Sequence, residues 1–392
     1  MRLSLPRLIA KRSNESKKSL DVDDASLQLE QMYAAEKAVN FRWISRLLAT
    51  KSSYVLSPKD VAPPCISHFL AQIIQFAQLA IGISSPDFLF RNLDLLSRPD
   101  FPLDKSLYDA LGGSIFIESF IGDVAQLQGY TVYRPEQKQL VVAFSGTTTV
   151  RQALHDVNAL RVHYNGSPPH CLVHSGFYSL YRGIKELAIR SLRNSVQKFH
   201  PETIVCTGHS MGGAIAYFLC LDLMRDTEEL LGKDMNIIVA VFGCPRLGNP
   251  ELASYWRSLA ESYREKHGPR SLLEVSVKGY NDGVPALPPA FLGYVHVCTN
   301  PYFLCEGQIY CVPPSECEHT VFTVAKDENS NTGPSIFPRG GHNYYVQDLE
   351  KLGRCMEWID VVSSGEAGWE ERYKKKKAQW EKKWMNRGSR GT

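Results

Sequence analysis

The chain has 392 residues, of which 44% are hydrophobic and 22% are charged, and its formal net charge is +3. This balance is typical of a globular protein with a large core and excludes a largely disordered chain. The length exceeds that of an ordinary single domain, although α/β enzymes often reach it through insertions.

The charge is distributed unevenly along the chain. Residues 1–18 carry six Lys or Arg and one Glu, and residues 369–392 carry nine Lys or Arg and three Glu. The two ends therefore have net charges of +5 and +6, which leaves −8 for the body between them. Such basic ends indicate either peripheral contact with an anionic membrane or lipid surface, or two solvated tails. No nucleic-acid partner is expected.

The first residues contain no continuous apolar stretch of the kind found in a signal peptide, because Pro6 and Arg7 interrupt it. We therefore expect a cytoplasmic location, with peripheral attachment to a membrane or lipid surface and mitochondrial targeting as alternatives. Apolar residues at helical spacing predict a helix over residues 24–48. Pro58, Pro63 and Pro64 then interrupt the pattern and mark the edge of the main domain.

Three segments follow from these boundaries: a basic, helical extension over residues 1–60, a main domain over residues 61–365, and a basic, aromatic tail over residues 366–392. Within the main domain, Phe69 to Ile83 is too short to span a bilayer and predicts an amphipathic core helix. Strands are expected at residues 139–144, 203–207, 237–242 and 272–277, of which 237–242 is an unbroken apolar run, and an amphipathic helix is expected at residues 177–199. Continuous apolar strands that alternate with helices predict an α/β fold, with a mostly parallel sheet covered by helices on both faces.

Gly208-His209-Ser210-Met211-Gly212 follows one of these strands and precedes a helical pattern. The order of strand, G-x-S-x-G and helix describes a nucleophile elbow, in which a sharp turn exposes the serine hydroxyl. The helix N-terminus beneath the serine directs free N–H groups at an oxyanion that forms above it. We therefore expect Ser210 to be a hydrolytic nucleophile.

The acid and the base of such a site belong on loops after later strands, in the order Ser, Asp, His. Asp282 lies in a turn just past the strand at residues 272–277, and His342 lies on a glycine-containing loop far along the chain. His296 competes for the role of base, but it follows Asp282 too closely and is expected to be structural. His209 is expected to point away from the serine hydroxyl, because it precedes Ser210 in the turn.

The remaining expected groups are two oxyanion donors, the N–H of Met211 and the N–H of Thr147, which follows the strand at residues 139–144. No metal or organic cofactor is implied. Cys305, Cys311 and Cys317 cluster in one region, and the sequence leaves their redox state open.

Several motifs occur in the order found in one family. The chain resembles the class 3, fungal-type triacylglycerol lipases of the α/β-hydrolase fold. The similar segments are Phe144-Ser145-Gly146-Thr147, a lid-like stretch at residues 150–157, His174-Ser175-Gly176-Phe177, the elbow, Gly243 to Asn249, Asp282 to Pro289, and Gly341-His342-Asn343-Tyr344-Tyr345. This resemblance implies a serine carboxylester hydrolase that acts on lipid esters through Ser210, His342 and Asp282 and an acyl-enzyme. The alternatives are an acyltransferase or a non-lipid carboxylesterase that uses the same elbow, and a silent membrane-binding scaffold.

Four aromatic residues of the tail, Trp369, Tyr373, Trp380 and Trp384, fall on one stripe of a helix. Lysines flank the stripe, as in helices that lie on a lipid surface. The stripe predicts either attachment to such a surface or docking on the main domain. Acyl-chain length, the choice between glycerides and phospholipids, the strength of lid-dependent activation and the oligomeric state are not specified by the sequence.

Overall fold

The computed structural model describes residues 41–80, 86–91, 93, 109–146, 160–325, 340–342, 345, 368, 371–372, 374–375 and 378–379. The helices within them are α2 (Arg42–Leu48), α3 (Pro64–Leu79), α4 (Pro86–Arg91), α7 (Ser175–Phe199), α8 (Met211–Leu231) and α9 (Pro250–His267). Short 3-10 helices are η1 (Pro58–Asp60), η3 (Asp109–Leu111), η4 (Val284–Ala286), η5 (Ala290–Leu292) and η6 (Pro314–Glu316).

Twelve strands lie in the described part of the chain. They are β1 (Lys51–Leu56), β2 (Ile115–Ile121), β3 (Gln128–Arg134), β4 (Gln139–Phe144), β5 (Arg161–His163), β6 (Leu172–His174), β7 (Thr203–His209), β8 (Asn236–Phe242), β9 (Leu272–Gly279), β10 (Pro301–Cys305), β11 (Gln308–Cys311) and β12 (Val321–Val324).

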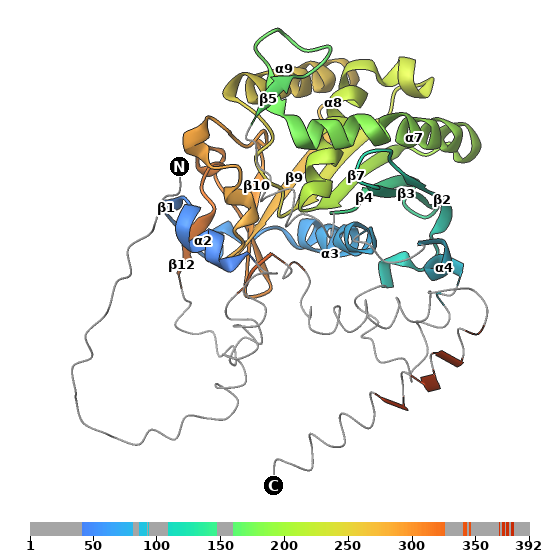
Figure 1. The fold of residues 1–392 in the computed structure, drawn as a ribbon, viewed down its shortest axis with the longest axis horizontal. Coiled ribbons are helices and arrows are strands. Elements are labelled where there is room, and N and C mark those ends of the chain that lie inside the picture. Colours follow the sequence, from blue (N-terminus) through green and yellow to red (C-terminus); the bar gives the residue numbers. More distant parts are fainter. Residues whose placement is uncertain are drawn as a thin grey trace, which may run out of the picture.

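Eight strands form the central sheet in the order β11-β10-β9-β8-β7-β4-β3-β2. Strands β4, β7, β8, β9 and β10 are parallel, whereas β2, β3 and β11 pair antiparallel at the two edges. Helices α7 and α8 pack on one face, and α3 packs on the other (Figure 1). The expected mostly parallel sheet with helices on both faces is therefore confirmed.

The apolar runs of the central strands supply two cores because successive side chains point to opposite faces. In β4, Leu140 and Val142 pack with α7 and α8, and Val141 and Ala143 pack with α3. All four of these side chains are fully buried. The continuous apolar sequence is therefore explained by burial on both faces.

Helix α3 begins where the prolines were expected to mark a boundary, with Pro64 in its first turn, where the missing N–H costs nothing. Its Gln75 is buried, although glutamine is mostly exposed in proteins. The Gln75 amide donates to Asp109 Oδ1 at 2.9 Å and accepts from Ala110 N at 3.0 Å, so it holds η3 onto the helix. None of the described helices is long and apolar enough to cross a membrane.

A second, two-stranded sheet joins distant parts of the chain. Strand β1 pairs in parallel with β12, and Leu56 packs there with Phe303 and Phe322. Figure 1 shows α2 and β1 beside β12, although more than 250 residues separate them in sequence. The three-part division of the chain stays a prediction, and residues 41–60 of its first segment lie against the main body through these elements.

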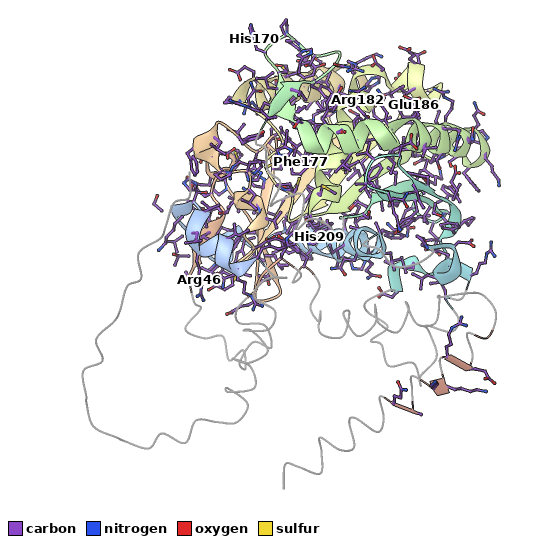
Figure 2. All side chains as sticks on the ribbon, viewed as in Figure 1. Arg46, His170, Phe177, Arg182, Glu186 and His209 are labelled. Atoms are coloured by element: carbon purple, nitrogen blue, oxygen red, sulfur yellow. The ribbon has the colours of Figure 1, made fainter. Side chains whose placement is uncertain are left out.

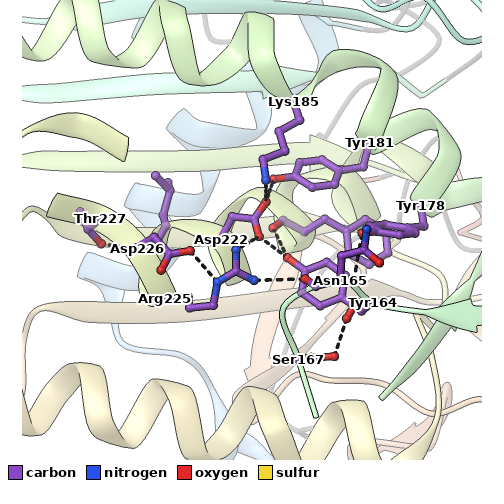
Figure 3. Close-up of polar contacts among 12 residues, drawn as sticks. Tyr164, Asn165, Ser167, Tyr178, Tyr181, Lys185, Asp222, Arg225, Asp226 and Thr227 are labelled. Carbon is purple, nitrogen blue, oxygen red and sulfur yellow. Dashed lines mark hydrogen bonds and ion pairs between the residues drawn. The ribbon is translucent and has the colours of Figure 1, made fainter. Parts of the chain in front are cut away.

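A buried carboxylate connects α7, α8 and the segment after β5. Asp222 accepts hydrogen bonds from the hydroxyls of Tyr164, at 2.6 Å, and Tyr181. It also pairs with Lys185 at 2.8 Å and with Arg225 at 3.1 Å (Figure 3). Because a buried charge is tolerated only when it is paired and hydrogen-bonded, this cluster fixes the packing of the three segments.

Candidate active site

Ser210 stands at the junction of β7 and α8, as the sequence predicted. Its backbone has φ 60° and ψ −131°, a conformation that L residues rarely adopt. A Cβ on Gly208 would collide with the backbone of Gly212, and a Cβ on Gly212 would collide with the carbonyl of Phe144. The two glycines therefore permit a turn too tight for other residues. The Ser210 hydroxyl is buried and has no hydrogen-bond partner among the described residues.

Asp282 and His342, which are 60 residues apart, form a buried pair. The imidazole Nδ1 donates to the carboxylate and lies 3.0 Å from each of its oxygens. Asp282 is fully buried and also accepts from the N–H of Val284 at 2.8 Å and from the Tyr345 hydroxyl. With Nδ1 engaged, Nε2 is the ring atom left to accept a proton.

His209 connects this pair to the elbow. Its Nε2 donates to the backbone carbonyl of His342 at 2.8 Å, and the centroids of the two imidazole rings are 4.3 Å apart. Burial, with the adjacent His342 ring, holds the pKa of His209 well below its ordinary value. Figure 2 shows His209 in the interior, beneath the layer that contains α7. A neutral His209 thus connects the loop of His342 to the turn that carries Ser210.

Gly243 leaves the space in which the acid and the base meet. Its φ is 59°, and a Cβ there would lie 2.8 Å from Asp282 Oδ2, 2.9 Å from the Tyr345 hydroxyl and 3.1 Å from His342 Cε1. Gly243 follows β8, and Asp282 follows the neighbouring parallel strand β9. The side chains of Asp282, His342 and Tyr345 therefore meet at the carboxyl edge of the sheet, where ligands bind in open α/β sheets.

The oxyanion donors are described in part. Met211 is the first residue of α8, so its N–H is one of the helix N–H groups without an intrahelical acceptor. Thr147 lies outside the described residues, as does the lid-like segment at 150–157. The loop that leads to Thr147 is described: a Cβ on Gly146 would lie 3.9 Å from the Ser210 hydroxyl oxygen. Ser145 anchors this loop to β3, because its N–H donates to the Gln128 carbonyl at 2.9 Å.

His296 lies elsewhere. Its Nε2 donates to the Pro285 carbonyl at 3.0 Å, and its backbone N–H donates to Glu318 at 2.7 Å. Burial, with the charges of Lys278 and Arg246, keeps the pKa of His296 well below its ordinary value. The structure therefore brings His342, and not His296, to Asp282.

The described residues contain no group of three or more His, Cys, Asp or Glu side chains placed to hold a metal ion. Cys305, Cys311 and Cys317 are free thiols. In the antiparallel pair of β10 and β11, Cys311 lies opposite Tyr302, and Cys305 lies opposite Gln308. This register explains why the cysteines of the two strands are not partners.

Phe41, Gly243 and Tyr345 also lie against Asp282 or His342, and the sequence assigned none of them a role. Tyr345 belongs to the segment that suggested His342, and Gly243 belongs to another of the similar motifs, so a signal existed for both. Phe41 carries no such signal, because only the tertiary fold brings it to His342.

Known proteins resemble this chain in sequence and in fold. The family described as Lipase (class 3) matches residues 141–292. A lipase from Rhizomucor miehei is 27% identical over 204 residues, which cover 52% of this chain and 49% of that protein. The secreted mono- and diacylglycerol lipase A of Penicillium cyclopium is 29% identical over 248 residues, covering 62% of this chain and 73% of the relative.

Solved lipase structures share the architecture. The lipase from Rhizopus microsporus var. chinensis superposes with a TM-score of 0.52 at 21% identity, covering 70% of this chain and 88% of that one. A structure described as a triacylglycerol lipase with a serine protease triad as its catalytic centre superposes with a TM-score of 0.52 at 20% identity, covering 73% and 96%. The fold is therefore that of the α/β-hydrolases, as the sequence motifs implied.

The cytoplasmic location expected from the sequence is wrong. The relatives from Penicillium cyclopium and Malassezia globosa are named secreted mono- and diacylglycerol lipases, which points to an extracellular protein. The expectation rested on the composition of the first residues, which is a weaker guide to location than these relatives.

The elbow, the resemblance of the motifs, the family match and the shared architecture agree with one another. Together they support the class 3, fungal-type lipase family, which the sequence motifs resemble and whose model matches residues 141–292.

Proposed function

We propose that this protein is a lipase that hydrolyses acylglycerol esters through an acyl-enzyme on Ser210. The observation that carries the proposal is the buried Asp282–His342 pair, which His209 connects to the strained elbow. The relatives support the substrate class, since they are named lipases and mono- and diacylglycerol lipases.

In the proposed reaction, His342 takes the proton of Ser210 while the hydroxyl oxygen attacks the ester carbonyl. Asp282 holds the imidazole with its proton on Nδ1 and stabilises the positive charge that forms on the ring. The N–H groups of Met211 and Thr147 would bind the oxyanion, aided by the N-terminal dipole of α8. His342 then protonates the leaving alcohol, and water, activated by the same imidazole, releases the fatty acid and restores Ser210.

The first test replaces the nucleophile. Ser210→Ala removes the attacking oxygen, and we expect it to reduce kcat by roughly a million-fold while the protein stays folded. Covalent labelling by a fluorophosphonate should vanish in the same variant. If Ser210→Ala still labels and still hydrolyses esters, Ser210 is not the nucleophile and the proposal fails.

The second arm of the test identifies the substrate class. Wild-type protein is assayed on short-chain to long-chain soluble esters and on emulsified mono-, di- and triacylglycerol and phospholipid, with and without an added alcohol acceptor. Release of fatty acid from acylglycerols supports the proposal. Transfer of the acyl group to the alcohol in preference to water would instead identify an acyltransferase.

The basic ends supply a further proposal, namely that they hold the enzyme on an anionic lipid surface. Residues 371–372, 374–375 and 378–379 of the C-terminal segment are helical, and Lys374 and Lys375 are exposed. The aromatic stripe at Trp369, Tyr373, Trp380 and Trp384 and the basic residues 1–18 lie outside the described residues. The proposal therefore rests on charge and on the helical spacing in the sequence.

A further inference from the structure

The first described residues of the chain pack directly on the loop that carries Asp282. A Cβ on Gly283 would collide with the carbonyl oxygen of Phe41 and would lie 2.6 Å from the N–H nitrogen of Ser45. The backbone at the start of α2 thus sits against the loop at a distance that only glycine permits. Phe41, which precedes the helix, has φ 53°, so the chain turns sharply at this contact.

The same residues contact the base. The rings of Phe41 and His342 are arranged edge to face, with 5.3 Å between centroids and an interplanar angle of 85°. Aromatic rings prefer this geometry because the positive edge of one meets the negative face of the other. His342 is therefore held on two sides: by the Phe41 ring and by the His209 ring.

Arg42 fixes the backbone just before His342. Its Nε donates to the carbonyl of Gly340 at 2.5 Å, and the Arg42 side chain is buried. On the other side of this turn, the N–H of Gly341 donates to the Tyr280 carbonyl at 2.8 Å. Gly340 and Gly341 have φ values of 53° and 126°, where glycine is the least restricted residue. The direction in which His342 projects thus depends on contacts made by other segments.

We infer that Phe41 and Arg42 are positioning residues, which hold the His342 imidazole in its productive orientation between Asp282 and Ser210. This inference rests on the proposed function. It makes residues 41–45 a part of the active site, although Phe41 and His342 are 301 residues apart in sequence. Misplacing a catalytic group by about 1 Å costs on the order of a hundred-fold in rate, so loss of these contacts should reduce kcat selectively.

The experiment compares substitutions at Phe41 that distinguish the effect of losing the aromatic ring from the effect of the backbone turn. Phe41→Ala deletes the ring and keeps a side chain at positive φ, whereas Phe41→Gly deletes the ring and relieves the backbone. Both should lower kcat on a soluble short-chain ester by roughly 10- to 100-fold with little change in KM. Phe41→Tyr keeps the aromatic edge and should restore most of the rate.

Arg42→Lys provides an independent second variant, since it keeps the charge and loses the planar donor that reaches Gly340. It should lower kcat in the same way. The matched control is Arg46→Lys on the same helix, where the side chain is exposed at the periphery (Figure 2). This control should match wild type in kcat, KM and thermal midpoint.

The outcomes separate this inference from the proposed function. If Ser210→Ala is inactive and the Phe41 and Arg42 variants keep wild-type kcat, the positioning role is overturned and the proposed function stands. Wild-type kcat in Phe41→Gly alone would assign the effect of Phe41→Ala to the turn, which also overturns the role of the ring. Should Phe41→Ala fail to fold, Phe41→Gly and Arg42→Lys decide the matter. If Ser210→Ala keeps its activity, the proposed function itself fails.

Discussion

At the scale of single residues, the site is built from backbone conformations that most side chains avoid. Ser210 has φ 60°, Asn281, which precedes Asp282, has φ 59°, and Gly243 has φ 59°. At Ser210 and Asn281, which are not glycines, such a backbone costs of the order of 1–3 kcal/mol per residue, and it persists where the surrounding structure imposes it. In this protein these conformations place the Ser210 hydroxyl and the Asp282 carboxylate at the same edge of the sheet, and Gly243 leaves room there for the side chains of Asp282 and His342.

Two of the buried histidines, His342 and His296, should respond differently to substitution. His342→Ala removes the group that touches Asp282, so kcat should fall roughly a million-fold, about as far as in Ser210→Ala, because members of a triad act as a unit. His296→Ala removes a donor to the Pro285 carbonyl and leaves a cavity. It should lower the free energy of unfolding by roughly 2–4 kcal/mol and leave kcat of the folded protein nearly unchanged.

Both variants are measured at equal concentrations of folded protein, which are determined by urea unfolding. Rates on one soluble ester then separate catalysis from stability. An inactive, folded His296→Ala protein beside an active His342→Ala protein would reverse the two assignments.

At the scale of single elements, α7 begins with an N-cap that depends on pH. His174 Nδ1 accepts from the N–H of Phe177 at 3.3 Å, and the two rings stack with centroids 4.2 Å apart. Burial lowers the pKa of His174 to about 4. Its other nitrogen, Nε2, is buried without a hydrogen-bond partner among the described residues. Between about pH 6.5 and pH 4 the imidazole therefore stays neutral in the folded protein, whereas it is charged in the unfolded chain.

This cap should contribute to acid sensitivity. Between about pH 6.5 and pH 4 the unfolded chain binds a proton at His174 that the folded protein does not, so stability falls as the pH falls. The contribution present at pH 7 and lost by pH 4 is roughly 3 kcal/mol. His174→Asn keeps an acceptor for the Phe177 N–H and removes the titrating group. Its unfolding free energy should fall less steeply on acidification than that of wild type.

Denaturant unfolding at several pH values measures this difference. His170→Asn serves as the control, because the His170 side chain is exposed at the periphery (Figure 2). Burial also lowers the pKa values of His209 and His296, but these two groups are present in both proteins. The difference in pH dependence between wild type and His174→Asn therefore reports on His174. Parallel pH profiles for wild type and His174→Asn would contradict the prediction.

The sequence predicted best the helices and strands whose pattern of apolar residues directly indicates which faces are buried. Strands β4, β7 and β8 are largely apolar runs, and α7 has one apolar face, so burial on two faces or on one could be read from the residues. Strand β9 is apolar at its start but also buries Glu274, Ser276 and Lys278, which its sequence did not indicate. The predicted helix at residues 24–48 is described only from residue 42 onward, as α2. Strands β1 and β12 were not predicted, because short edge strands are half exposed and their sequences do not identify a partner.

The same distinction applies to the site. The elbow, Asp282 and the segment of His342 could be located from turn chemistry and chain order, because local constraints specify them. Phe41 and Arg42 could not, since their contacts with His342 and Gly340 arise only when α2 packs against the loops after β9. Local patterns thus identify groups that react, whereas the groups that orient them depend on long-range packing.

At the scale of the whole molecule, the chain combines a body of net charge −8 with two basic ends. Electrostatic attraction of the ends to an anionic surface would be opposed by the acidic body unless the body faces away from that surface. Each Lys near an anionic leaflet contributes about 1 kcal/mol, and salt weakens this contribution. The C-terminal segment therefore has enough charge to hold the enzyme on a lipid surface at low ionic strength.

Removing residues 369–392 tests this arrangement. The shortened protein should keep its thermal midpoint and its kcat on a soluble short-chain ester, because the site lies in the body. It should lose salt-sensitive binding to vesicles that contain anionic lipid, and its rate on emulsified acylglycerol should fall with the loss of binding. A second variant with Gln at residues 374–377 keeps the aromatic stripe and removes four positive charges, so its residual binding should be less sensitive to salt than that of wild type. A fall of several degrees in midpoint with unchanged vesicle binding would contradict attachment and show instead that the tail packs on the body.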